Sequence, residues 1–193
     1  IMLFFLVSMG ACTKQEELLH EQESGVLKVK SIIYPVPTGE PFAQNDLDNT
    51  VIGLLESRND FHWEWVDLKT LWSALQYNDH SLAIGYKPSG EGDFSTKIHE
   101  INIRSGAYKD VHDALLNLIL TELNRNSDEQ ITLQQILIED DPILPIITIR
   151  LTDKNALTRL YNLENVRYLE PLDYWPANAQ RVASSSGCSA STE

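Results

Sequence analysis

Residues 144–171, LPIITIRLTDKNALTRLYNLENVRYLEP, carry two strand signals on either side of one helix signal. The first, at residues 146–151, combines β-branched residues with a rough alternation of apolar and polar positions, which favours a strand with one buried face. The second, at residues 166–169, stops at Glu170 and Pro171, because proline cannot donate a hydrogen bond to a sheet. Between them, Thr152 or Asp153 can cap a helix whose apolar positions recur at helical spacing: Leu157, Leu160 and Tyr161. The stretch therefore predicts a strand, a helix and a strand.

The residues upstream repeat this arrangement. Residues 97–103 alternate apolar and polar side chains, and residues 107–123 place apolar residues at the 3.6-residue spacing of a long helix. Ser127 and Gln130 form a capping-box pattern, but residues 136–138 favour a strand, and we expect a strand there. The order from residue 97 predicts an α+β fold, a ferredoxin-like antiparallel sheet with two helices on one face.

An N-terminal extension of helical and extended segments precedes this unit. Residues 26–34 alternate well enough to predict a strand, and residues 45–55 predict a short helix. Residues 61–65, FHWEW, form an aromatic-rich strand or turn. Asp67 can cap a further helix with an apolar face. The next strand, at residues 81–86, would form a hairpin with residues 97–103.

The composition indicates a folded domain that does not bind nucleic acid. The chain has 193 residues, of which 42% are hydrophobic, so it can bury a substantial core. Its 15 basic and 28 acidic residues give a formal charge of −13. A nucleic-acid-binding surface needs clustered positive charge, which this balance disfavours.

The first residues, IMLFFLVSMGACTK, look like the second half of a secretory signal. Met9-Gly10-Ala11-Cys12 resembles a bacterial lipoprotein signal, in which the cysteine is lipidated; Met9 stands where leucine is usual. The alternative is that the apolar run is a buried N-terminal strand or helix. Lipidation of Cys12 would place the protein in the bacterial cell envelope, as an outer-membrane or surface lipoprotein, or as a secreted protein after maturation.

The predicted organisation has four parts. Residues 1–12 form the truncated signal peptide, residues 13–44 a flexible tether, residues 45–176 the α+β domain and residues 177–193 a truncated, Ser/Ala-rich linker. Since the chain starts inside a signal and stops inside a linker, we expect a fragment of a longer protein. Cys188 is the only other cysteine, so it is either free or paired with a residue elsewhere.

The end of the opening stretch resembles a known family. A strand ITIRLT, a helix with NALTRL and a final NVRYLEP are similar to the end of the propeptides of subtilisin-like serine proteases. The last strand of those propeptides ends in a similar Val-x-Tyr-Val-Glu-Pro run, matched here by Val166, Tyr168, Leu169, Glu170 and Pro171. The similarity extends loosely back to about residue 81 and does not cover residues 26–80.

The resemblance implies a mechanism. Such a propeptide assists the folding of the protease that follows it, lays its sheet against the protease and runs its C-terminal tail through the active cleft. Glu170 and Pro171 would lead into this tail, and Tyr174 and Trp175 would anchor it in pockets of the cleft. The alternative is that Tyr174 and Trp175 cap the core of their own domain. The partner would be a subtilisin-like catalytic domain in the same chain.

The sequence offers no catalytic residues, metal ligands or cofactor site. The Asp-Ser/Thr-Gly, His-Gly-Thr and Gly-Thr-Ser motifs of a subtilisin-like catalytic domain are missing, and Gly187–Ser191 lacks the final glycine of a nucleophile elbow. The histidines show no metal-ligand spacing. A second hypothesis is therefore a lipid-anchored α+β module that binds a peptide or an envelope partner.

Overall fold

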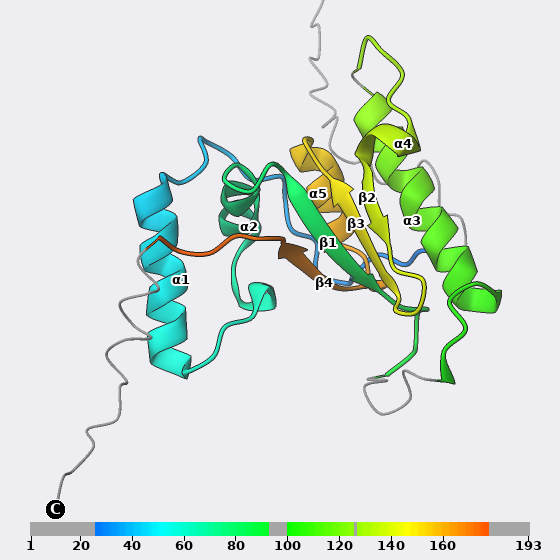
Figure 1. Ribbon diagram of the computed structural model, residues 1–193, viewed down its shortest axis with the longest axis horizontal. Coiled ribbons are helices and arrows are strands. Elements are labelled where there is room, and N and C mark those ends of the chain that lie inside the picture. Colours follow the sequence, from blue (N-terminus) through cyan, green and yellow to red (C-terminus); the bar gives the residue numbers. More distant parts are fainter. Residues whose placement is uncertain (1–25, 93–99, 126, 178–193) are drawn as a thin grey trace, which may run out of the picture.

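The computed structural model describes residues 26–92, 100–125 and 127–177, which include a four-stranded antiparallel sheet (Figure 1). The strand order is β2-β3-β1-β4, so β1 and β3 are central and β2 and β4 are the edges. Every pairing is antiparallel. The strands are β1 (Ser81–Tyr86), β2 (Leu137–Asp140), β3 (Ile146–Arg150) and β4 (Val166–Pro171).

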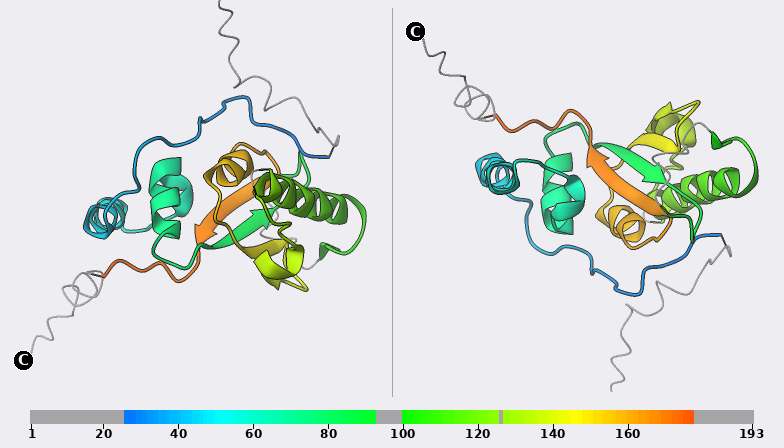
Figure 2. Two further views of the ribbon diagram at one scale, coloured as in Figure 1. Left: turned by 90° about the horizontal axis from the view of Figure 1, so that it is seen from above. Right: turned by 90° about the horizontal axis from the view of Figure 1, so that it is seen from below.

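Two helices lie on one face of this sheet (Figure 2). Helix α3 (Gly106–Asn124) connects β1 to β2 by way of the single-turn α4 (Leu133–Ile136), and α5 (Lys154–Tyr161) connects β3 to β4. The order β1-α3-β2-β3-α5-β4 with this sheet topology is the ferredoxin-like arrangement, which confirms the predicted fold class.

Local signals set the bounds of α5. The carboxylate of Asp153 accepts hydrogen bonds from the backbone amides of Asn155 at 2.7 Å and Ala156 at 2.8 Å, and thereby caps the helix. Asp153, and not Thr152, is the cap. The apolar positions behind it follow helical spacing, and Leu157 and Leu160 are fully buried.

The N-terminal extension packs beside the sheet, next to β4 and α5 (Figure 1). It contains α1 (Gln44–Arg58), the 3₁₀ turn η2 (Trp63–Trp65) and α2 (Leu68–Leu75). Asp67 caps α2 by accepting from the Thr70 amide at 2.7 Å, as predicted. The aromatic segment 61–65 forms a turn and not a strand.

Residues 26–34 do not form the predicted strand. This segment is extended but makes a single isolated bridge, between Val29 and Leu163. Two buried asparagines bind its backbone instead: Asn165 accepts from the Lys28 amide at 2.7 Å, and Asn162 accepts from the Tyr34 amide at 2.8 Å. Residues 26–44, which we assigned to a tether, therefore run against the domain, and Val26, Leu27 and Phe42 pack on its core.

The predicted strand at residues 97–103 is also wrong in its described part. Residues 100–103 are not in the sheet, and residues 97–99 lie outside the described ranges. Ile101 and Ile103 pack on the core from an irregular segment, so their alternation reflects burial and not strand pairing. The first strand of the ferredoxin-like order is therefore β1 and not residues 97–103. Strand β1 pairs with β3 and β4, and not in the predicted hairpin.

The region before β2 begins with a different cap from the one predicted. Thr132 and Gln135 form the capping box of α4, with the Thr132 amide donating to Gln135 Oε1 at 2.7 Å. Ser127 and Gln130 do not open a helix. The strand expected in the second half of this region is confirmed as β2. None of the helices in the described residues has the length and apolar character required to span a membrane.

Candidate functional site

The candidate site is the sheet face opposite α3 and α5, which we call the open face. Leu82, Ile84 and Tyr86 point toward the helices, so the alternating residues Ala83 and Gly85 belong to the open face. No helix of the described residues lies across this face (Figure 2). The sheet therefore has one face that forms the core and one that no described helix covers, although Ala83 and Thr148 at the centre of this second face are buried.

Small residues make the centre of the open face flat. Ala83 lies opposite Thr148 of β3 and Glu170 of β4, and Gly85 lies opposite Ile146 and Tyr168. A Cβ atom on Gly85 would overlap the ring of Tyr168, so the ring can lie over this strand only because residue 85 is glycine. Burial raises the pKa of Tyr168 above its usual value, which keeps the phenol neutral.

Charged residues surround this flat centre. Glu139, Arg150 and Glu170 are exposed on the three strands that border it. Arg150 donates to Asp79 at 2.7 Å, an exposed pair that contributes little to stability. A flat apolar centre with a charged rim is the usual composition of a protein-binding surface.

The chain leaves the open face at the end of β4. Pro171 is buried and pairs with Leu82, and the Leu172 amide donates to the Ser81 carbonyl at 3.0 Å. Asn78 then donates to the Leu172 carbonyl at 2.8 Å. We call residues 172–177 the C-terminal segment; its start is tied to the sheet.

The four predicted tail residues have different environments. Glu170 is exposed on the open face, and Pro171 is buried within the sheet. The Tyr174 hydroxyl donates to Asp48 at 2.6 Å, and its ring makes an edge contact with Trp63 at 5.5 Å. Trp175, by contrast, is 69% exposed. Glu170 and Trp175 are thus accessible, whereas Tyr174 contacts its own domain.

Two other clusters of charged residues connect structural elements. His112 on α3 contacts Asp113 at 2.9 Å and Asp140 of β2 at 3.2 Å. The buried Glu122 carboxylate pairs with Arg125 and with Arg159 of α5. Within the described ranges, no group of His, Cys, Asp and Glu residues could hold a metal ion.

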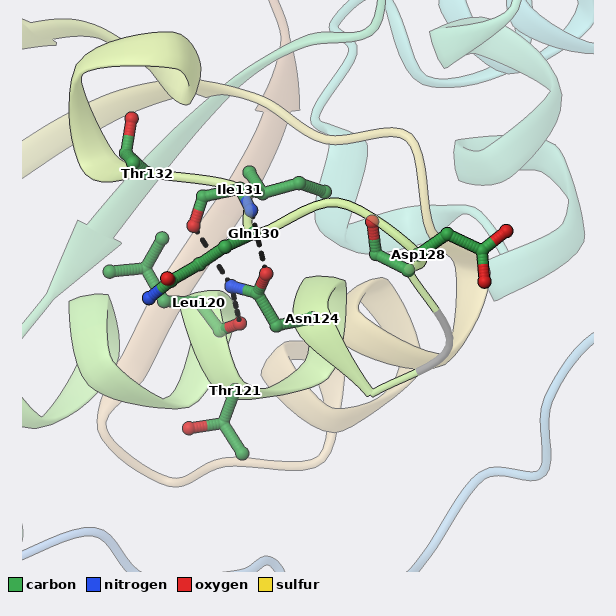
Figure 3. Close-up of a pocket in the computed structure, with 8 residues that line it drawn as sticks. Leu120, Thr121, Asn124, Asp128, Gln130, Ile131 and Thr132 are labelled. Carbon is green, nitrogen blue, oxygen red and sulfur yellow. Dashed lines mark hydrogen bonds between the residues drawn. The ribbon is translucent and has the colours of Figure 1, made fainter.

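The hollows of the surface do not suggest a substrate site. The wider one, about 720 Å³, lies between the end of α3 and the loop before α4, and most of its lining residues are exposed (Figure 3). Asn124 closes this loop by donating to Ile131 and Leu120 and accepting from the Ile131 amide at 2.7 Å. A second cavity of about 220 Å³ borders β4. Its Lys30 ammonium donates to the Tyr161 carbonyl at 2.7 Å, and burial lowers the pKa of Lys30.

Sequence reasoning missed Asp48, Gly85 and Tyr168 as residues that shape this site. The signal for Asp48 was its place beside Leu47 and three residues before Val51, within the apolar stripe of α1. The signal for Gly85 was a glycine inside an otherwise regular strand, which indicates the close approach of another group.

Comparisons with protein-family models, curated proteins and solved structures found no match for this chain. The fold defines a ferredoxin-like α+β domain with one sheet face that no helix of the described residues covers. Cys12 and Cys188 lie outside the described residues.

Proposed function

We propose that this chain is the N-terminal propeptide of an exported subtilisin-like serine protease, and that it assists the folding of a catalytic domain and inhibits it. The observation that carries the proposal is the position of the segment Val166–Pro171. This segment, whose sequence resembles the end of subtilase propeptides, forms the whole of edge strand β4 in a ferredoxin-like sheet.

The open face supports a docking role. The Tyr168 ring lies over Gly85, and the short side chains of Ala83 and Thr148 are buried between their neighbours. A docking partner would therefore rest on the half-buried Tyr168 and on the exposed residues around it, Glu139, Arg150 and Glu170. Glu170 adds a charge at the edge, and the exit of the chain from β4 places the C-terminal segment beside the docking face. An inhibitor of this kind binds first through a broad surface and then through a short peptide segment.

Inhibition of a purified bacterial subtilisin by the full chain, followed with a chromogenic peptide, tests the proposal. We expect slow, tight inhibition. Glu170→Arg should weaken it about tenfold or more, since a reversed charge at a binding rim disturbs complementarity. Asp110→Arg is the matched control, because it makes the same charge change at an exposed position on α3. Digestion of the chain without inhibition, or equal effects of both variants, would contradict the proposal.

The coding sequence downstream of Glu193 gives an independent test. The proposal predicts the Asp, His and Ser motifs of a subtilisin-like catalytic domain there. A stop codon soon after Glu193 would exclude inhibition in cis.

A second candidate function is a lipid-anchored module that binds a peptide or an envelope partner through the open face. The contacts of Tyr174 favour it, because a residue bound to Asp48 and Trp63 is not free to enter a cleft. Under this candidate, the full chain would be stable but would not inhibit subtilisin.

Either function would operate in the cell envelope if Cys12 is lipidated. Cys12→Ser should then move the protein from the membrane fraction to the soluble fraction of an expressing bacterium. Unchanged fractionation would contradict the lipid anchor without affecting the argument from the open face.

A further inference from the structure

The C-terminal segment is bound by the N-terminal extension. It leaves β4, crosses in front of α2 and reaches α1 (Figure 1). At α1, Asp48 accepts a hydrogen bond from the Tyr174 hydroxyl at 2.6 Å and another from the Ala177 amide at 3.2 Å. Asp48 and Tyr174 are 126 residues apart in sequence, so this contact joins the two ends of the described domain.

The Asp48 side chain is suited to this segment. It is 1% exposed and lies among the buried residues of α1. Within the described residues, both hydrogen bonds to its carboxylate come from the C-terminal segment. A buried carboxylate without donors is strongly unfavourable, so α1 and the segment stabilise each other.

Two further features hold the segment in its bent path. Residues 172–173 form a turn in which Asp173 has a φ of 56°, a left-handed conformation that aspartate tolerates. The Tyr174 ring packs edge-on against Trp63, which is itself 8% exposed. A substrate-like peptide lies extended in a protease cleft, so the segment cannot both follow this path and occupy a cleft.

We propose that Asp48 is a clamp that keeps the C-terminal segment on α1, and that this contact must open before the segment can enter a protease cleft. The second half of this statement rests on the proposed function. The clamp gives residues 26–80, which the family resemblance does not cover, a role in controlling the inhibitory tail.

Limited proteolysis tests the clamp itself. Chymotrypsin is added to the full chain, and cleavage after residue 174 is followed by mass spectrometry. The rate reports the fraction of molecules in which the segment is detached, provided that reclosing is faster than cleavage. Tyr174→Phe keeps a cleavable aromatic ring but removes the hydroxyl. It should raise the rate about tenfold or more, as loss of a hydrogen bond to a charged group predicts.

Asp48→Asn should also raise the rate, because it removes the negative charge that strengthens the hydrogen bonds from Tyr174 and Ala177. Asp46→Asn, at an exposed position in the first turn of α1, is the matched control and should leave the rate unchanged. Circular dichroism verifies that each variant is folded. If folded Tyr174→Phe is cleaved within twofold of the unmodified chain, the clamp is wrong.

Inhibition of subtilisin tests whether the contact with Asp48 must open before the segment enters a protease cleft. Where the unmodified chain inhibits, Tyr174→Phe should inhibit about tenfold more tightly, because the open state no longer has to be reached against the clamp. Faster proteolysis with unchanged or weaker inhibition would overturn the link between clamp and cleft. Faster proteolysis with no inhibition by any form would support the clamp and overturn the proposed function.

Discussion

The two faces of the sheet are built from the same four strands but have opposite character. On the covered face, Ile84, Ile147 and Ile149 are fully buried beneath α3 and α5. On the open face, the positions between them are Ala83, Gly85 and Thr148, and charged residues lie around them. Since side chains alternate along a strand, each strand contributes to both the covered face and the open face.

The difference teaches where function can change without loss of the fold. Large branched residues on the covered face supply the burial that stabilises the domain. Ala83 and Thr148 on the open face are buried as well, but their small side chains remove less apolar surface from water. Substitutions on the two faces should therefore have separable effects on stability and on binding.

The largest expected effect is on the covered face. Ile84→Ala should lower the free energy of unfolding by about 2–5 kcal/mol, because it removes fully buried methyl groups and leaves a cavity. Glu170→Ala, on the open face, should change it by about 0.5 kcal/mol or less, since its side chain is exposed. Urea denaturation measures both; equal losses would contradict the division between the faces.

An intermediate loss of stability is expected at Gly85, where the Tyr168 ring lies against the backbone. Gly85→Ala should cost about 1–3 kcal/mol, because the new methyl group displaces the Tyr168 ring or shifts the strand. In a Tyr168→Ala background the same change should cost clearly less, which a double-mutant cycle in urea would show.

Gly53→Ala is the control for the glycine substitution, since a Cβ there meets no atom within 4 Å. In the middle of α1 it should stabilise the protein by about 0.5–1 kcal/mol. If Gly85→Ala lowers the free energy of unfolding equally in the unmodified chain and in the Tyr168→Ala background, the Tyr168 ring is not the obstacle.

The smallest loss of stability is expected for a substitution in the turn that joins β2 to β3. The backbone amides of Leu144 and Ile143 donate to Asp141 and hold its pKa below the usual value. Its contribution to stability is therefore present above the pKa of an unfolded aspartate, roughly 3.9, and is lost as the pH falls through the lower folded pKa. Asp141→Ala should cost about 0.5 kcal/mol or less at pH 7, because the half-buried side chain remains in contact with solvent, which screens its charge.

The difference between Asp141→Ala and the unmodified chain should shrink in thermal unfolding as the pH falls below about 3.9, because the carboxylate becomes protonated. Asp128→Ala, at an exposed aspartate, serves as the control. A difference that persists unchanged at low pH would show that the ionised carboxylate is not its source.

Elements with local signals were predictable from sequence. Asp153 precedes a helix with clear apolar spacing, and α3 repeats Val111, Leu115 and Ile119 on one buried side. Such patterns depend on residues a few positions apart. The fold class followed from the order of these elements.

The failures involve partners that are distant in sequence. Residues 26–34 alternate like a strand, but their backbone is bound by asparagines up to 137 residues away. The site shows the same limit, because Tyr174 was recognised as an aromatic anchor while its acceptor on α1 was not. Apolar alternation indicates burial; it does not identify the partner.

The position of β1 in the centre of the sheet has a consequence for synthesis. Its neighbours, β3 and β4, begin 60 or more residues after the end of β1. On the ribosome, β1 and the segment bound by Asn165 cannot complete their contacts until Pro171 has emerged. The nascent chain therefore exposes the apolar residues of β1 until β3 and β4 have been synthesised, and non-local pairing of this kind slows folding.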